Sequence, residues 1–201
     1  QAFINCSKLS SVTFLGDKIT MMYSEIFKYC TSLKEFTFPE KVASTWYRVF
    51  EGCTSLESVT LPPNMVSVAR ETFYCCTSLK SIEFPSTVKT FETMCFGNCS
   101  SLTSITIPAA VTSIPENFCC HCTGIRAINF HQDIESIGSN AFMGCTGLES
   151  VTLPNKVNNY GSTPFGDCTS LKIACYNGDL NPETYVDEIF HNSQVEFVYV
   201  N

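Results

Sequence analysis

Eight cysteines recur along this chain at a nearly constant spacing, which is the strongest constraint on its fold. They are Cys6, Cys30, Cys53, Cys76, Cys99, Cys122, Cys145 and Cys168. Every interval is 23 residues except the first, which is 24 because one extra residue falls within Leu15–Lys18. Self-similarity at such a period is typical of solenoids, in which each unit is too short to bury its apolar face alone and stacks on its neighbours.

Five further columns keep register with the cysteines. The third residue after each cysteine is leucine or isoleucine, as in Leu56 and Ile125, and the sixth is mostly valine, isoleucine or phenylalanine. Proline then recurs in five units, and phenylalanine closes most units, although Cys119 takes that place once, beside Phe118. Six columns in register over most of the chain predict one unit stacked about eight times.

Each unit predicts a strand, a turn, a second short extended piece and a helical turn. Residues 56–61 alternate around Val59 and are expected to form a short parallel strand, which Pro62 ends because proline cannot donate to a ladder. Residues 65–68 are expected to be extended on the opposite side of the coil. The stretch ending in Phe73 is expected to form one or two helical turns. Eight coils at about 4.8 Å each predict a short curved rod, roughly 38 Å long.

Composition narrows the class of function. The 201 residues include 12 basic and 19 acidic side chains, for a formal net charge of −7, with no basic run. A nucleic-acid partner is therefore not expected. No stretch approaches the roughly 18 apolar residues of a membrane span. No nucleophile–base pattern or glycine-rich phosphate loop is present, and the ionisable side chains are scattered, so we expect no enzymatic activity, no catalytic residue and no cofactor.

One unit reads Cys53-Thr-Ser-Leu56-Glu-Ser-Val59-Thr-Leu61-Pro62, then an apolar pair, then Phe-x-x-Cys. This pattern, repeated over about residues 1–176, resembles the BspA-type leucine-rich repeats of bacterial and protozoan surface proteins. The resemblance implies an α/β fold: a right-handed leucine-rich-repeat solenoid with a concave parallel β-sheet and short helical turns. It also implies a protein at the cell surface or secreted that binds a host or matrix protein, and it brings no catalytic residues.

The last residues depart from the repeat. Residues 182–190 could form a short helix, and residues 195–200 alternate like a final strand. A solenoid end exposes its core and an unpaired strand edge, so a cap is expected there. We therefore predict a leucine-rich-repeat array over residues 1–176 and a C-terminal cap over residues 177–201, in a monomer or a weak end-to-end assembly.

The thirteen cysteines first suggest a secreted disulfide scaffold. In-register stacking argues otherwise, because it separates neighbouring Cβ atoms by about 4.8 Å, whereas a disulfide prefers about 3.5–4.5 Å. We interpret the eight periodic cysteines as a structural ladder of buried thiols. The run Cys119-Cys120-His121-Cys122 could suggest a metal site, but Cys119 and Cys122 occupy core columns and no second pair is present, so no metal is expected.

Two surfaces are candidates for ligand binding. The first is the outward face of the predicted strands, for which we single out Glu57, Thr60, Lys80, Glu83, Thr106, Arg126, Asn129 and Thr152. Ordinary solvated strand surface is the alternative interpretation. The second is aromatic: Tyr23 and Trp46 share one column, with Tyr47 beside them. Binding hot spots favour Trp and Tyr, although these rings could equally pack against a preceding segment.

The sequence thus predicts a non-enzymatic protein-binding or adhesion module, located outside the cell or at its surface, that uses the solenoid surface. The alternative is a structural spacer, a repeat array that holds another domain away from the cell.

Overall fold

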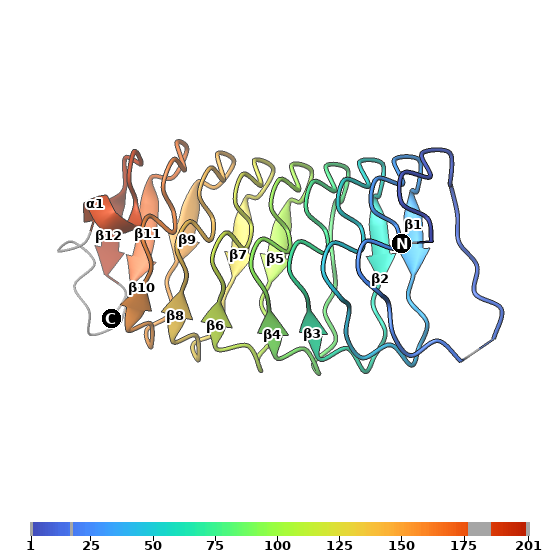
Figure 1. Cartoon of the computed structure of the whole chain (residues 1–201). Helices are drawn as coiled ribbons and strands as arrows, with labels where there is room; N and C mark the ends of the chain where they lie inside the picture. Colours follow the sequence, from blue (N-terminus) through green and yellow to red (C-terminus); the bar gives the residue numbers. More distant parts are fainter. Residues whose placement is uncertain (1, 17, 177–185, 200–201) are drawn as a thin grey trace.

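The structure, a computed structural model, describes residues 2–16, 18–176 and 186–199 and is an elongated stack of similar coils (Figure 1). Short strands lie in two rows along the stack. The first strand row contains β1 (Glu35–Thr37), β2 (Ser58–Thr60), β5 (Ser104–Thr106), β7 (Ala127–Asn129), β9 (Ser150–Thr152), β11 (Ile173–Tyr176) and β12 (Glu196–Tyr199). The second strand row contains β3 (Ser67–Val68), β4 (Thr90–Phe91), β6 (Ser113–Ile114), β8 (Ser136–Ile137) and β10 (Asn159–Tyr160).

The 23-residue period is the hydrogen-bonding register of the stack. Phe36 pairs with Val59 in the first strand row, and Ser113 pairs with Ser136 in the second, always in parallel. Pairing in the first strand row is interrupted, because β1–β2, β5–β7 and β9–β11–β12 form separate sheets. The fold is therefore a parallel β-solenoid whose first strand row contains breaks.

The phenylalanine column forms the centre of the core. Phe27, Phe50, Phe73 and Phe96 are fully buried or nearly so, and their rings stack with centroids 5.3–5.7 Å apart. The stack changes at Phe118, one position out of register, which meets Phe96 and the next ring edge-on, at 80° and 82°. Both geometries are favourable for aromatic pairs, so the core accommodates the shifted ring without a break in burial.

The segments expected to be helical turns are not helices. Among the described residues the one helix is α1 (Val186–Ile189), so the α/β expectation is corrected to a solenoid built almost wholly of strands and turns. Two observations explain the difference. Alternate backbone N–H groups in these segments donate to the next coil, as from the Phe50 N–H to the Thr72 carbonyl at 2.8 Å, and the N–H groups between them donate three residues back. Residues such as Arg48 and Tyr29 have φ near +60°, which a right-handed helix does not contain.

The periodic cysteines form a continuous ladder, and all thirteen cysteines of the chain are free thiols. Seven of the eight periodic cysteines are buried, Cys6 being half-buried. Each thiol from Cys30 onward donates to a carbonyl of the preceding coil, as Cys99 Sγ does to the Phe73 carbonyl at 3.2 Å. Burial raises the pKa of Cys53 and that of Cys168 to about 12. These side chains are therefore buried hydrogen-bond donors as well as small apolar groups.

The C-terminal segment continues the stack as far as it is described. β12 pairs with β11 in parallel, and the buried Phe190 stacks on Phe165 with centroids 5.5 Å apart. The Phe165 N–H donates to the Ile189 carbonyl at 2.9 Å, as in earlier coils. The predicted array ends at residue 176, and residues 177–185, which include the start of the predicted helix at residue 182, lie outside the described residues, so the cap stays a prediction.

Candidate ligand-binding surface

The residues singled out on the strand face are all exposed and lie along the first strand row. They are Glu57, Thr60, Lys80, Glu83, Thr106, Arg126, Asn129 and Thr152. Parallel pairing sets equivalent positions beside each other, as for Thr106 and Asn129, where the Asn129 amide donates to Thr106 Oγ1 at 3.0 Å. The sequence pattern thus places these residues on one face, but they form a spaced row of polar groups and not a cluster.

Charge pairing along this row is local. Lys80 Nζ lies 2.5 Å from Glu57 Oε2, and both side chains are largely exposed. The hydrogen bond from Lys80, followed by its charge, holds the pKa of Glu57 below its usual value. Exposed pairs of this kind are screened by water and salt and add little stability. They leave the charged groups available to a partner.

The aromatic residues lie along the second strand row. Tyr23 and Trp46 have ring centroids 6.1 Å apart, tilted by 48°, and are 59% and 47% exposed. Tyr47 is 45% exposed, and Met21 and Val66 are exposed in neighbouring columns of the first coils. We call these five residues the aromatic patch. It is separate from the row of Thr60 and Thr106, so the two candidate surfaces do not form one site.

Sequence reasoning missed an ion-pair network in the turns of the first coils. Arg48 contacts Glu71, lies 3.4 Å from Glu51 and lies 3.8 Å from Glu25, all of which are mostly buried carboxylates. Lys28 Nζ lies 2.9 Å from Glu51 Oε2. The hydrogen bond to Glu71 raises the pKa of Arg48 further above its ordinary value. Alternating charges at positions 25, 48 and 71, one repeat apart, were the signal that could have revealed it.

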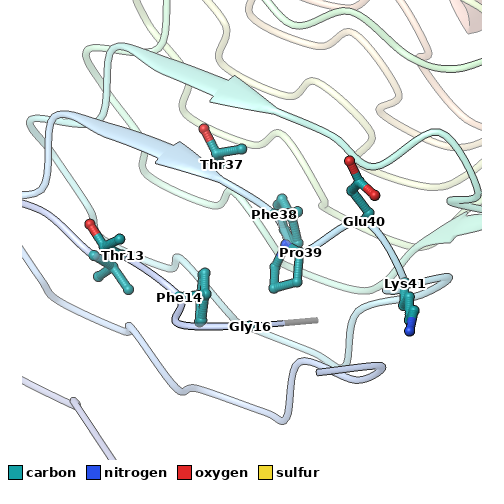
Figure 2. A pocket seen from close by; sticks show the side chains of 9 residues that line it. Thr13, Phe14, Gly16, Thr37, Phe38, Pro39, Glu40 and Lys41 are labelled. Atoms are coloured by element: carbon teal, nitrogen blue, oxygen red, sulfur yellow. The ribbon is translucent and has the colours of Figure 1, made fainter. Parts of the chain in front are cut away.

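Sequence reasoning also missed a groove beside β1. A cavity of about 460 Å³ opens there and is lined by Val12, Thr13, Phe14, Gly16, Thr37, Phe38, Pro39, Glu40 and Lys41. Figure 2 shows Thr13, Phe14 and Gly16 on one wall and Thr37 to Lys41 on the other. The groove therefore has apolar rings, hydroxyl groups and charged side chains within one opening.

The cysteine–histidine run does not converge. Cys119, Cys120 and Cys122 are buried, while His121 is exposed and its ring lies over Gly144, where a Cβ would be 2.4 Å from Nδ1. Across residues 2–16, 18–176 and 186–199, no group of three or more His, Cys, Asp or Glu side chains could hold a metal ion. The run therefore contributes buried thiols and one exposed imidazole, and not a converging set of ligands.

A parallel β-solenoid with exposed polar and aromatic surfaces belongs to the class of repeat-built scaffolds. The family model for the BspA-type leucine-rich-repeat region matches residues 1–126 and 92–201, with 6 copies. The chain therefore belongs to the BspA-type leucine-rich-repeat family. The match indicates no catalytic family.

Solved structures share the fold. A leucine-rich cell surface protein from Faecalibacterium prausnitzii is 25% identical with a TM-score of 0.74, over 80% of this chain and 44% of that one. The leucine-rich-repeat protein of T. pallidum is 22% identical with a TM-score of 0.70, over 90% of this chain and 81% of that one. This chain therefore spans less than half of the F. prausnitzii protein. No match was found among curated proteins. In the described segments, no helix is long and apolar enough to cross a bilayer.

Proposed function

We propose that this chain is a protein-binding module of a cell-surface or secreted protein, and that it adheres to a host or matrix protein through the solenoid surface. The aromatic patch is the observation that carries the proposal. Nine large hydrophobic side chains are exposed in the described residues, and five of them are Met21, Tyr23, Trp46, Tyr47 and Val66. Contiguous exposed apolar surface marks interaction sites, and Trp and Tyr are the residues most enriched at binding hot spots.

The membership of the BspA-type family and the likeness to a protein described as a leucine-rich cell surface protein support the location. The strand-face residues, among them Lys80 and Arg126, supply charged groups that could orient a partner on the other side of the coil. Affinity would come from the aromatic patch, because exposed hydroxyls and charges contribute less than a desolvated ring.

A pull-down from host or matrix extract tests the proposal. The variant Tyr23→Ala/Trp46→Ala removes both rings of the patch. Thr93→Ala/Glu116→Ala is the matched control, because these residues occupy the column of Tyr47 in later coils. We expect the first variant to lose at least tenfold in captured partner and the control to bind as the unmodified protein does. Equal capture by both variants would remove the aromatic patch from the proposal.

A structural spacer is the second candidate. The stack is elongated, and the matched region is less than half of the F. prausnitzii protein, so an array of this kind can be one part of a longer chain. A spacer requires stiffness and no specific partner. The pull-down distinguishes the two functions, because a spacer would capture no partner even as the unmodified protein, in which both candidate surfaces are intact.

A further inference from the structure

One edge of strand β1 has no backbone partner among the described residues. The Phe38 N–H donates to the Thr60 carbonyl, and the Lys34 carbonyl accepts from Glu57, so residues 34, 36 and 38 face β2. Successive residues of a strand point their backbone groups to opposite edges. Glu35 and Thr37 therefore direct their N–H and C=O groups toward the first coil. Among the described residues, no backbone hydrogen bond joins residues 7–16 to β1.

The first coil turns away from the stack at this point. Phe14 still contacts Phe36, with centroids 5.7 Å apart, but beyond it Leu15 is 98% exposed and Gly16 has open space around it. Figure 1 shows this part of the chain diverging from the neighbouring coil. The extra residue of the 24-residue interval lies here. The cavity of about 460 Å³ fills the resulting space between Phe14 and Thr37–Lys41.

We propose that this groove binds an extended segment of a partner polypeptide, which adds to the edge of β1 as a strand. Thr37, which lines the groove, offers one backbone donor and one acceptor, and Glu35 offers a second pair from the same edge of β1. Phe14 and Pro39, both partly exposed, offer an apolar wall for alternate side chains of the segment. Backbone pairing supplies affinity, and the wall supplies selectivity, in this mode of recognition. The inference rests on the proposed function only in that the partner is a polypeptide.

A second break in the first strand row shows why the first is the better site. A cavity of about 400 Å³ lies between Ser58–Leu61 and Ser81–Pro85. There the repeat keeps its 23-residue spacing, and the Lys80 N–H still donates to the Glu57 carbonyl at 3.3 Å. The walls therefore remain joined. The groove beside β1 has neither constraint, because its connection is one residue longer and no backbone hydrogen bond joins residues 7–16 to β1 in the described part of the chain.

The probe is a fluorescein-labelled peptide with the sequence of residues 55–61, Ser-Leu-Glu-Ser-Val-Thr-Leu. Within the protein, this segment contains β2 and pairs with the opposite edge of β1. We expect saturable binding by fluorescence anisotropy. We also expect at least tenfold slower amide hydrogen exchange at Glu35 and Thr37, measured by NMR in reduced protein. The same peptide with an N-methyl group on its valine should bind at least tenfold more weakly. No binding and no protection at millimolar peptide would overturn the proposal.

Three variants separate backbone pairing from side-chain contact. Thr37→Pro removes an N–H that faces away from β2, so the strand should keep its place while affinity falls at least tenfold. Thr37→Ala keeps the backbone and should bind within twofold of the unmodified protein. Deletion of Gly16 restores the 23-residue interval, which should pair residues 12–14 with β1, protect the Thr37 amide in the free protein and abolish binding. Far-UV circular dichroism checks that each variant is folded.

Unchanged affinity in Thr37→Pro, or in the Gly16 deletion, would refute strand addition even if the peptide binds. Tyr23→Ala/Trp46→Ala should bind the peptide normally, because these residues lie along the second strand row. Failure of the groove and failure of the aromatic patch are thus observed in different variants and different assays.

Discussion

The thiol ladder predicts a defined stability cost for Cys99→Ala. Cys99 is fully buried, and its thiol donates to the Phe73 carbonyl at 3.2 Å. Loss of one buried heavy atom removes about 1 kcal/mol of transfer free energy and leaves a methyl-sized void that costs about 1 kcal/mol more. The lost hydrogen bond adds little, because the Phe73 carbonyl still accepts from the Cys76 N–H at 3.1 Å. We expect a loss of about 2 kcal/mol in the free energy of unfolding.

Urea unfolding under reducing conditions measures this change, followed by far-UV circular dichroism and by the fluorescence of the single tryptophan. Cys175→Ala is the matched control, because Cys175 is only half-buried. Its cost should stay within about 0.5 kcal/mol. A cost below about 0.5 kcal/mol for Cys99→Ala would show that the ladder position tolerates a void and would refute the packing argument. A cost above about 4 kcal/mol would show that the thiol does more than fill space and donate one weak bond.

Three further perturbations test other parts of the structure. Burial raises the pKa of Cys53 to about 12, so between pH 9 and pH 12 the thiol ionises in the unfolded chain but stays protonated in the folded one. The free energy of unfolding should therefore fall as the pH rises through this range. The urea midpoint, measured against pH, should fall less steeply in Cys53→Ala than in the unmodified protein. Gly52→Ala should lower the free energy of unfolding by about 2 kcal/mol, because Gly52 has φ +71° and a Cβ there would lie 2.2 Å from the Tyr29 ring. In a double-mutant cycle, adding Tyr29→Ala should recover part of that loss. Arg48→Ala should cost about 2 kcal/mol in thermal unfolding because three mostly buried carboxylates each lose one of their charged partners. Lys80→Ala removes one partner of an exposed pair and should leave the melting temperature unchanged.

The recurring residue columns predict most of the fold. Burial at a 23-residue period requires each coil to stack in register on the next, so Phe36 opposite Val59 follows from the sequence alone. The turn segments do not follow in the same way. Left-handed residues are usually glycine or asparagine, but Arg48 and Glu71 hold such positions here, and neither residue type signals a positive φ. Hydrogen bonds to the next coil hold that backbone, and a sequence read unit by unit does not contain them.

The candidate surfaces were predictable in part. The column rule places Tyr23 beside Trp46, and the rings do lie side by side. The strand-face row was placed by the same rule, and whether these residues bind a partner stays a proposal. The groove beside β1 was not predictable, although the 24-residue interval marked its position. An extra residue can be absorbed as a bulge or can release a neighbouring strand, and the choice depends on packing around Phe14 and Phe36.

The direction of the backbone hydrogen bonds has a mechanical consequence. Many of these bonds run from coil to coil, along the long axis of the stack, as between Phe50 and Thr72. A pulling force applied along that axis therefore loads one rung of bonds at a time, and the terminal coil should peel before the rest of the stack yields. Each peeled coil would release about 23 residues and lengthen the chain by roughly 70 Å. Under tension the molecule should extend in repeated steps, so the coils that hold a partner could stay folded while terminal coils unfold.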